Sequence, residues 1–228
     1  MTFALVLAES ALELMPRELQ REPAIRREAR EIGIPPERML LDASHHLASM
    51  RKRLGDWERR GRPDLVHFCT LLALDSRLNK EQGIRIFVHT RNDEVIEFAS
   101  DLRFPRAYAR FYGLMQDLFT KGRITSPDGK VLMAVRKQKL KELMADLAKT
   151  HSLYALDVNG RRAGISQIAT EIAGKDACFI IGGFPHGAFA EKQVLKLPAF
   201  SISDKELCAW AVLLDVLAAC ELASEGKK

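Results

Sequence analysis

The alternation of apolar and polar residues along the chain predicts a mixed α/β protein. Short apolar or period-2 runs are typical of strands, and apolar residues that recur every three to four positions are typical of helices. These patterns predict strands over residues 2–7, 39–41, 84–89, 95–98, 153–157 and 177–181. They predict helices between Pro16 and Gly33 and over residues 44–54, 63–74, 105–121, 139–149, 165–173 and 204–222.

The order of these elements indicates how the sheet is built. Residues 84–89 and 95–98 are expected to form one β-hairpin, and the turn signal at residues 126–129 predicts a second. In the last third, strand, helix, strand, loop and helix follow one another, which implies parallel pairing. Functional loops of such sheets lie at the carboxyl ends of the strands. We therefore expect them at residues 182–190 and 200–204.

The composition favours one globular domain. The chain has 228 residues, 47% of them hydrophobic and 29% charged, which excludes disordered, collagen and coiled-coil classes. The longest apolar stretch, 208–220, carries Asp215 and is too short to span a bilayer, so no membrane association is expected. The cysteines lie far apart in apolar contexts and are predicted to be buried thiols in a reducing compartment; they are Cys69, Cys178, Cys208 and Cys220. We expect a cytoplasmic protein.

Positive charge is concentrated in the first two thirds of the chain. Residues 1–150 hold 27 basic and 21 acidic residues, whereas residues 151–228 hold 8 and 9. The excess gathers at residues 51–62, 103–110 and 136–141. The net charge of +5 is compatible with a polyanion partner without requiring one.

Two segments of the last third have features of a ligand site. CFIIGGFPHG (178–187) is an apolar strand that runs into a glycine-rich loop, and glycines allow a backbone to approach a ligand closely. A tight strand-to-helix connection explains these glycines equally well, and the loop has neither Walker nor GxGxxG spacing. Ser203 and Glu206 have the spacing of a helix capping box, and capping alone explains Ser203, Asp204 and Glu206.

Two groups of arginines could bind an anion. Arg106 and Arg110 are spaced to share one helix face, just after Arg103, and a phosphate would relieve their mutual repulsion. A solvated basic face is an equal alternative. Asp64 could orient Arg62 through a charge-assisted pair, although stabilisation of the first helical turn explains Asp64 more simply. The six histidines have no metal-binding spacing, so no metal is predicted.

Taken together, these segments resemble one family along nearly the whole chain: the SPOUT-class pseudouridine-N(1)-specific methyltransferases of small-subunit ribosomal RNA, the nucleolar essential protein family of ribosome biogenesis, in its archaeal form. The resemblance is carried by LVLAESALEL (5–14), LLDASHHLASM (40–50), RGRPDLVHF (60–68), LLALDSRLNK (71–80), IRIFVHT (84–90), LRFPRAYARFYGLMQDLF (102–119), IIGGFPHG (180–187) and SISDKELCAWAV (201–212).

The resemblance implies an α/β-knot fold with a C-terminal trefoil knot, family-specific β-hairpin and helical insertions, and a homodimer. It implies a single domain, 1–228, whose basic part, 1–150, binds RNA and whose remainder, 151–228, forms the knot, binds cofactor and dimerises. The expected cofactor is S-adenosylmethionine, with contacts from Tyr154, Gly182, Gly187, Ile202, Ser203, Asp204, Lys205, Glu206 and Leu207. The expected partner is small-subunit rRNA, held by Arg62, oriented by Asp64, and by Arg103, Arg106 and Arg110, with ribosomal assembly proteins as further candidate partners.

The chemistry implied by the resemblance is methyl transfer to N(1) of a pseudouridine. Asp75 is a candidate general base, and Asn79 a second polar group near it. Arg77 stands where the family usually has proline, so the resemblance does not predict the conformation of the turn at this position. Two other functions are kept as alternatives: an RNA-binding assembly factor with weak or dispensable methylation, and an α/β enzyme that binds a different nucleotide.

Overall fold

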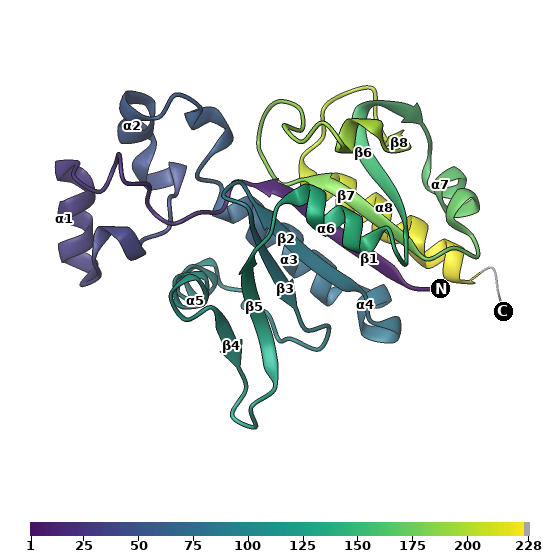
Figure 1. The fold of residues 1–228 in the computed structure, drawn as a ribbon, viewed down its shortest axis with the longest axis horizontal. Coiled ribbons are helices and arrows are strands. Elements are labelled where there is room, and N and C mark those ends of the chain that lie inside the picture. The colour runs from purple at the N-terminus through teal and green to yellow at the C-terminus, as the bar shows by residue number, and fades with distance from the viewer. Residues whose placement is uncertain (226–228) are drawn as a thin grey trace.

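In the computed structural model, which describes residues 1–225, these residues build one eight-stranded sheet with helices on both faces (Figure 1). The strand order is β4-β5-β3-β2-β1-β7-β6-β8. The strands are β1 Phe3–Ser10, β2 Arg85–Thr90, β3 Glu94–Phe98, β4 Arg123–Thr125, β5 Val131–Lys137, β6 Ser152–Arg162, β7 Ala177–Gly182 and β8 Ala199–Ser201. The predicted α/β class is confirmed.

Parallel and antiparallel pairing divide this sheet. The central strand β1 pairs in parallel with β2 and β7, and β6 pairs in parallel with β7 and β8. The pairs β2–β3, β3–β5 and β4–β5 are antiparallel, which confirms both predicted hairpins. The β4–β5 hairpin projects from the body of the molecule (Figure 1).

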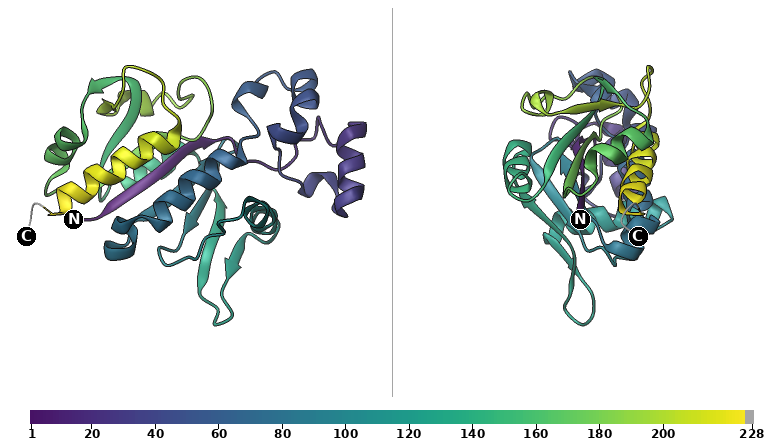
Figure 2. Two further views of the ribbon diagram at one scale, coloured as in Figure 1. Left: turned by 180° about the vertical axis from the view of Figure 1, so that it is seen from behind. Right: turned by 90° about the vertical axis from the view of Figure 1, so that its right-hand side faces the viewer.

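The side chains of β1 alternate between two cores, one on each face of the sheet, and helices cover both faces. Phe3, Leu5 and Leu7 of β1 belong to the core beneath α3 and α8, which lie side by side on one face (Figure 2). Ala4, Val6 and Ala8 point to the other face, where α6 packs. The helices are α1 Pro23–Ile32, α2 Ala43–Arg53, α3 Pro63–Asp75, α4 Arg77–Gln82, α5 Tyr108–Lys121, α6 Leu140–Leu147, α7 Ile165–Ile172 and α8 Ala209–Glu225.

Residues 11–62 form a helical lobe beyond the carboxyl end of β1 (Figure 1). The lobe has its own apolar core, which includes Met15, Leu19, Ile25, Met39 and Met50. Helix α2 begins with a side-chain cap, because a carboxylate oxygen of Asp42 accepts the N–H of Ser44 at 2.8 Å. A separate core gives the lobe a fixed shape from which its basic residues can act.

Several predicted boundaries are wrong. The strand predicted over 39–41 is only an isolated bridge between Leu14 and Leu40, because this segment packs in the lobe core. Helix α1 begins at Pro23, where proline suits the first turn, rather than soon after Pro16. Helix α8 begins five residues later than predicted, and α4 and β8 were not predicted. Cys69, Cys178 and Cys220 are buried as expected, but Cys208 is exposed because it precedes the first turn of α8.

None of the helices within residues 1–225 has the length and apolar character needed to cross a membrane. Within the same residues, no three His, Cys, Asp or Glu side chains are grouped so that they could hold a metal ion.

Candidate functional site

A cavity of about 350 Å³ opens at the carboxyl ends of β7 and β8 and beside the middle of β6. Its walls are the middle of β6, residues 156–159, the glycine-rich loop 182–189, and the loop 201–207 that leads to α8. The volume lies within the range of about 300–1,000 Å³ that is usual for small-molecule sites. The two loops expected from the strand order therefore meet at one cavity.

The glycines of the first loop are required by close packing and by one turn. A Cβ on Gly182 would lie 2.9 Å from the ring of Phe184, and one on Gly183 would lie 2.2 Å from the hydroxyl of Ser10. Gly187 has a φ of +87°, in the left-handed region that favours glycine. Of the predicted contacts, Gly182 and Gly187 both line the cavity. The loop can therefore run close to β1 while one of its faces stays open to a ligand.

The loop 201–207 supplies the opposite wall. Five of its six predicted contact residues line the cavity, namely Ile202, Ser203, Lys205, Glu206 and Leu207. The sixth, Asp204, has an exposed carboxylate that lies 3.7 Å from Nε of Arg162 and does not line the cavity.

The predicted capping box is wrong. Because α8 begins only at Ala209, Ser203 lies outside the helix, and its hydroxyl accepts the N–H of Lys205 at 3.1 Å in a local turn. The carbonyl of Ser203 accepts the hydroxyl of Ser201 at 2.9 Å. These two bonds fold the segment along the cavity instead of into the helix.

Tyr154 lies under the cavity rather than in its wall. Its ring is buried and stacks on Phe179 and Phe200, with centroid distances of 5.7 and 5.3 Å. Phe200 lines the cavity, so Tyr154 supports the floor. Sequence patterns did not indicate the wall residues in the middle of β6, Leu156, Asp157 and Asn159, or His186 in the glycine loop. The rule that ligands bind at carboxyl strand ends could have found Asp157 and Asn159, because they end or follow the predicted strand 153–157.

The residues of this cavity fit S-adenosylmethionine, the cofactor expected from the resemblance. Leu156, Phe200 and Val212 give apolar surface for a base, and Ser203 and the main chain give hydrogen-bonding groups. The carboxylates of Asp157 and Glu206 also line the cavity and would favour a ligand that carries an ammonium and a sulfonium group.

The Arg62–Asp64 pair expected from the sequence is present at the start of α3. Arg62 donates from Nε and Nη2 to the two carboxylate oxygens of Asp64, both at 2.8 Å. Burial alone would raise the pKa of Asp64, but the hydrogen bonds and charge of Arg62 hold that pKa below its ordinary value. The bidentate geometry fixes the plane of the guanidinium while leaving a third of the Arg62 side chain exposed.

Arg103, Arg106 and Arg110 are exposed around the start of α5. The expectation that Arg106 and Arg110 share a helix face is wrong, because α5 begins at Tyr108. Residues before it are held in place by the burial of Phe104 and by His67, whose Nε2 lies 2.7 Å from the carbonyl oxygen of Pro105. The Arg106 side chain is 86% exposed, and its nearest carboxylate, that of Asp75, is 3.8 Å away.

Asp75 lies at the opposite end of α3 from Arg62 and does not line the cavity. It pairs with Lys80 at 3.2 Å. The amide nitrogen of Asn79 donates to the carbonyls of Leu74 and Ser100, so this buried side chain ties main-chain segments together. A catalytic role for Asp75 stays a prediction.

Arg77 leaves the turn before α4 intact. Ser76 keeps an extended backbone, with φ −60° and ψ 150°, and its hydroxyl accepts the N–H of Asn79 at 3.2 Å. Arg77 occupies the first helical position and pairs with Glu221 at 3.0 Å and Glu225 at 2.7 Å. The residue that departs from the family pattern thus joins α4 to α8.

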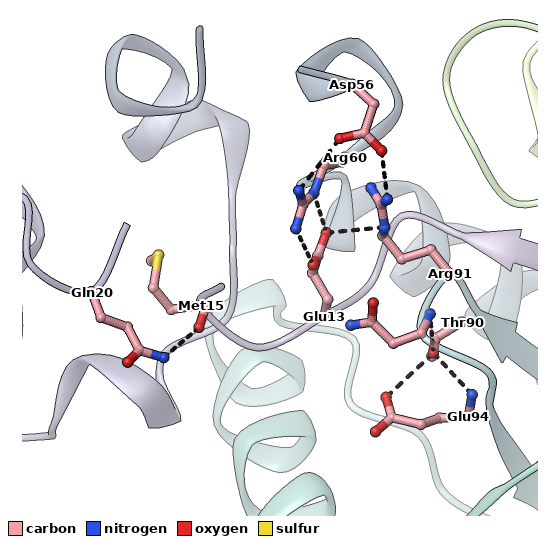
Figure 3. A network of polar contacts seen from close by, with 9 residues as sticks. Glu13, Met15, Gln20, Asp56, Arg60, Thr90, Arg91 and Glu94 are labelled. Carbon is pink, nitrogen blue, oxygen red and sulfur yellow. Dashed lines mark hydrogen bonds and ion pairs between the residues drawn. The ribbon is translucent and has the colours of Figure 1, made fainter. Parts of the chain in front are cut away.

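A network of ion pairs anchors the segment that leads to Arg62 (Figure 3). Arg60 donates to both oxygens of the buried Glu13, at 2.9 and 2.7 Å. Asp56 bridges Arg60 at 3.4 Å and Arg91 at 2.5 Å. The network connects the lobe to the turn between β2 and β3, and so it fixes residues 56–60 on the body of the molecule.

Comparisons with known proteins relate the chain to one family of methyltransferases. The profile of the family described as "EMG1/NEP1 methyltransferase" matches residues 5–221. The chain is 39% identical over 214 residues to a Thermococcus onnurineus protein named ribosomal RNA small subunit methyltransferase Nep1, covering 93% of this chain and 95% of that one. It is 40% identical over 219 residues to the Pyrococcus furiosus protein of the same name, covering 95% of each. A crystal structure of Archaeoglobus fulgidus Nep1 bound to S-adenosylhomocysteine superposes with a TM-score of 0.87 at 35% identity, covering 99% of this chain and all of that one.

Proposed function

Because the chain belongs to the EMG1/NEP1 methyltransferase family, we propose that it transfers a methyl group from S-adenosylmethionine to small-subunit ribosomal RNA. The observation that carries this proposal is the proximity of the cavity to the arginine surface. The main chain of Ala11 links the two, because its carbonyl accepts the N–H of Arg62 and its N–H donates to the carbonyl of Gly183 in the glycine loop, both at 2.9 Å. A nucleotide whose phosphate is held by Arg62 could therefore present its base to the cavity.

We propose N(1) of a pseudouridine as the methylated atom, in line with the family resemblance. This ring nitrogen is free in pseudouridine, whereas in uridine it forms the glycosidic bond. The bound cofactor would supply an electrophilic methyl group on its sulfonium. The base has to leave its stack to reach a cavity that is walled by a strand and two loops, and binding of its phosphates by arginines would stabilise that state.

The roles of individual residues follow from this arrangement. The glycine loop and the 201–207 loop would hold the cofactor, with Glu206 and Asp157 opposite its positive charges. Arg62, oriented by Asp64, would contact the RNA together with Arg103, Arg106 and Arg110. Positioning of the two reactants accounts for much of the rate in such transfers. Asp75 remains the proposed base only if the RNA or a second subunit brings it near the reacting nitrogen.

We further propose that the chain forms a homodimer through α3 and α8, and that residues 151–228 form a trefoil knot. Apolar side chains are exposed on these helices, among them Phe68 and Leu214, and Phe68 packs edge-to-face on Trp210 at 5.6 Å. The pairing of β8 with β6, rather than with the preceding β7, supports a chain path of the knotted kind. The division of roles between residues 1–150 and 151–228, the cytoplasmic location and the assembly-protein partners stay predictions.

The proposal is tested in two steps on the full chain. Calorimetry with S-adenosylhomocysteine should show binding, and methyl transfer should then be measured on an rRNA hairpin with pseudouridine or uridine at one position. Transfer only to the pseudouridine hairpin is the expected result. No binding of S-adenosylhomocysteine would contradict the methyltransferase function, and equal transfer to both hairpins would contradict the pseudouridine specificity. RNA binding without transfer would favour an assembly factor.

A further inference from the structure

The end of β1 has an unusual backbone at Glu9. This residue has a φ of +51°, in the left-handed region that side-chain-bearing residues rarely adopt. The conformation coincides with an irregularity in the pairing of β1 with β2 between Leu7 and Ser10. The N–H of Glu9 points to Nδ1 of the buried His89, at 3.3 Å. Strain of this kind persists only where other contacts hold it, and it is concentrated at functional sites.

The carboxylate of Glu9 is the contact that this backbone makes possible. One oxygen accepts the N–H of Ala190 at 2.9 Å, and the other accepts the N–H of Glu191 at 2.7 Å. These two amides directly follow the glycine loop, whose residues 182–189 form one wall of the cofactor cavity. The Glu9 side chain is only 11% exposed, so the carboxylate that accepts these two charge-assisted bonds is itself largely shielded from water.

Arg59 completes a clamp on the same loop. Its Nη2 donates to Glu9 at 3.1 Å, and its guanidinium lies over the ring of Phe184 at 4.4 Å from the centroid. The Phe184 ring also packs edge-to-face on Phe189, at 5.4 Å. Arg59 thus holds the outer side of the loop through one charge and one aromatic ring, while Glu9 holds the main chain where the loop ends.

The clamp is also continuous with the proposed RNA surface. Arg59 lies three residues before Arg62, in the segment that the Glu13 network anchors. The main chain of Ala11 joins the same two parts, because its N–H donates to the carbonyl of Gly183 and its carbonyl accepts the N–H of Arg62, both at 2.9 Å. A movement of the segment around Arg62 therefore reaches the cofactor loop by two routes.

We propose that Glu9 and Arg59 are positioning residues that hold the cofactor loop in its binding conformation and couple cofactor binding to RNA binding. The inference rests on the proposed function. Neither side chain lines the cofactor cavity, so both act through residues 184–191. The apparent affinity of a flexible loop for its ligand is reduced in proportion to the fraction of molecules in which the loop has its binding conformation. The clamp raises this fraction. RNA that holds Arg62 in place would then strengthen cofactor binding, and cofactor would strengthen RNA binding equally.

The first test measures S-adenosylhomocysteine affinity by calorimetry on the full chain. In Glu9→Gln, the single amide oxygen can still accept a hydrogen bond. The NH₂ group that replaces the other oxygen faces either a main-chain N–H or the Arg59 guanidinium, and a donor cannot bond to these donors. Loss of charge-assisted bonds predicts an affinity roughly 10- to 100-fold weaker. Glu58→Gln is the matched control, since it removes the same charge from an exposed side chain beside Arg59 and should leave the affinity unchanged.

The second test measures the coupling itself. S-adenosylhomocysteine affinity is determined with and without a saturating hairpin that carries uridine at the target position. In the unmodified protein the RNA should raise the affinity about fivefold or more. Arg59→Met keeps an apolar stem near Phe184 without the charge, and it should bring the ratio toward one. Arg59→Lys restores a cation and should recover part of the coupling. If Arg59 only stabilised the fold, replacing it would lower the unfolding temperature but leave the ratio of affinities with and without RNA unchanged.

The outcomes separate the clamp from the function on which it rests. If the unmodified protein binds no S-adenosylhomocysteine, the proposed function fails. If it binds and both Glu9→Gln and Arg59→Met keep its affinity and its coupling ratio, the clamp is wrong and the methyltransferase function stands. If Glu9→Gln does not fold, the two Arg59 variants, altered at a partly exposed position, still decide the question.

Discussion

Replacement of Gly183 by alanine tests how tightly the cofactor loop is packed on β1. The new Cβ would lie 2.2 Å from Oγ of Ser10 and 2.9 Å from Cγ of Leu7 and from the main-chain Cα of Ser10. The Ser10 hydroxyl is buried and donates to the carbonyl of Leu7 at 2.8 Å, so it cannot turn away without losing that bond. Gly183 also donates to Ala8 at 2.7 Å and accepts from Ala11 at 2.9 Å, which holds its own main chain in place.

Overpacking of this kind costs about 1–3 kcal/mol. For a chain of this size each kcal/mol lowers the melting temperature by about 2–4 °C, so Gly183→Ala should melt roughly 2–12 °C lower and bind S-adenosylhomocysteine more weakly. Gly113→Ala is the control, because Gly113 is an exposed position inside α5 with no atom within 4 Å of a new Cβ. There alanine should stabilise by about 0.5–1 kcal/mol.

The double variant Ser10→Ala with Gly183→Ala identifies the contact responsible. It removes the 2.2 Å clash but keeps the two contacts at 2.9 Å, so it should recover part of the lost melting temperature. Ser10→Ala alone loses one hydrogen bond and should destabilise by about 1 kcal/mol. A Gly183→Ala protein with the unmodified melting temperature and affinity would refute the close packing of loop and strand.

Three further predictions use matched variants or conditions. Arg106→Ala should reduce the slope of log K against log salt concentration in RNA binding by about 0.7–0.9. Arg27→Ala, at an exposed and ion-paired site on α1, is the control and should leave this slope unchanged. Equal slopes for the two variants would reject the phosphate contact of Arg106. Arg77→Pro should melt about 1–3 °C above Arg77→Ala when both are measured by calorimetry. Both variants lose the ion pairs to α8, but only proline, which suits a first helical position, restricts the unfolded chain. Melting in the reverse order would reject this account. Burial lowers the pKa of His89 in the folded protein, so below about pH 6.5 the unfolded chain takes up a proton first and the free energy of unfolding should fall from pH 7 to pH 5. The urea midpoint should fall less over this range in His89→Gln than in the unmodified protein. An equal fall would exclude His89 as a source of the pH dependence.

Periodicity predicted those parts of the fold that are set by burial on one or two faces. β1 and β7 are read correctly because long apolar runs suit strands that are covered on both sides, and both hairpins follow from turn residues between period-2 runs. The boundary at α8 was wrong because a cap contributes only about 1 kcal/mol, and the tertiary placement of residues 201–207 along the cavity outweighs it. The start of α5 was shifted in the same way by the burial of Phe104.

The candidate site was predictable where residues near in sequence act together, as in Arg62 with Asp64 and in the glycine loop. The Glu9–Arg59 clamp was not, because its two members are 50 residues apart and contact a loop that begins more than 120 residues after Arg59. No local pattern marks a carboxylate that accepts main-chain amides, and the left-handed backbone of Glu9 coincides with an irregular pairing of β1 with β2 that local sequence does not reveal. Such contacts depend on the complete sheet.

The charge boundary near residue 150 therefore separates proposed roles rather than structural units. Strand β1, from the basic part, lies between β2 and β7 at the centre of the sheet, and its end supports the cofactor loop through Glu9, Ser10 and Ala11. The same strand leads directly into the lobe that carries Arg59 and Arg62. Because one continuous segment touches both surfaces, a nucleotide at the arginines and a cofactor in the cavity would, under this proposal, act on the same few main-chain bonds. Cooperative binding of RNA and cofactor is therefore what the proposed clamp predicts.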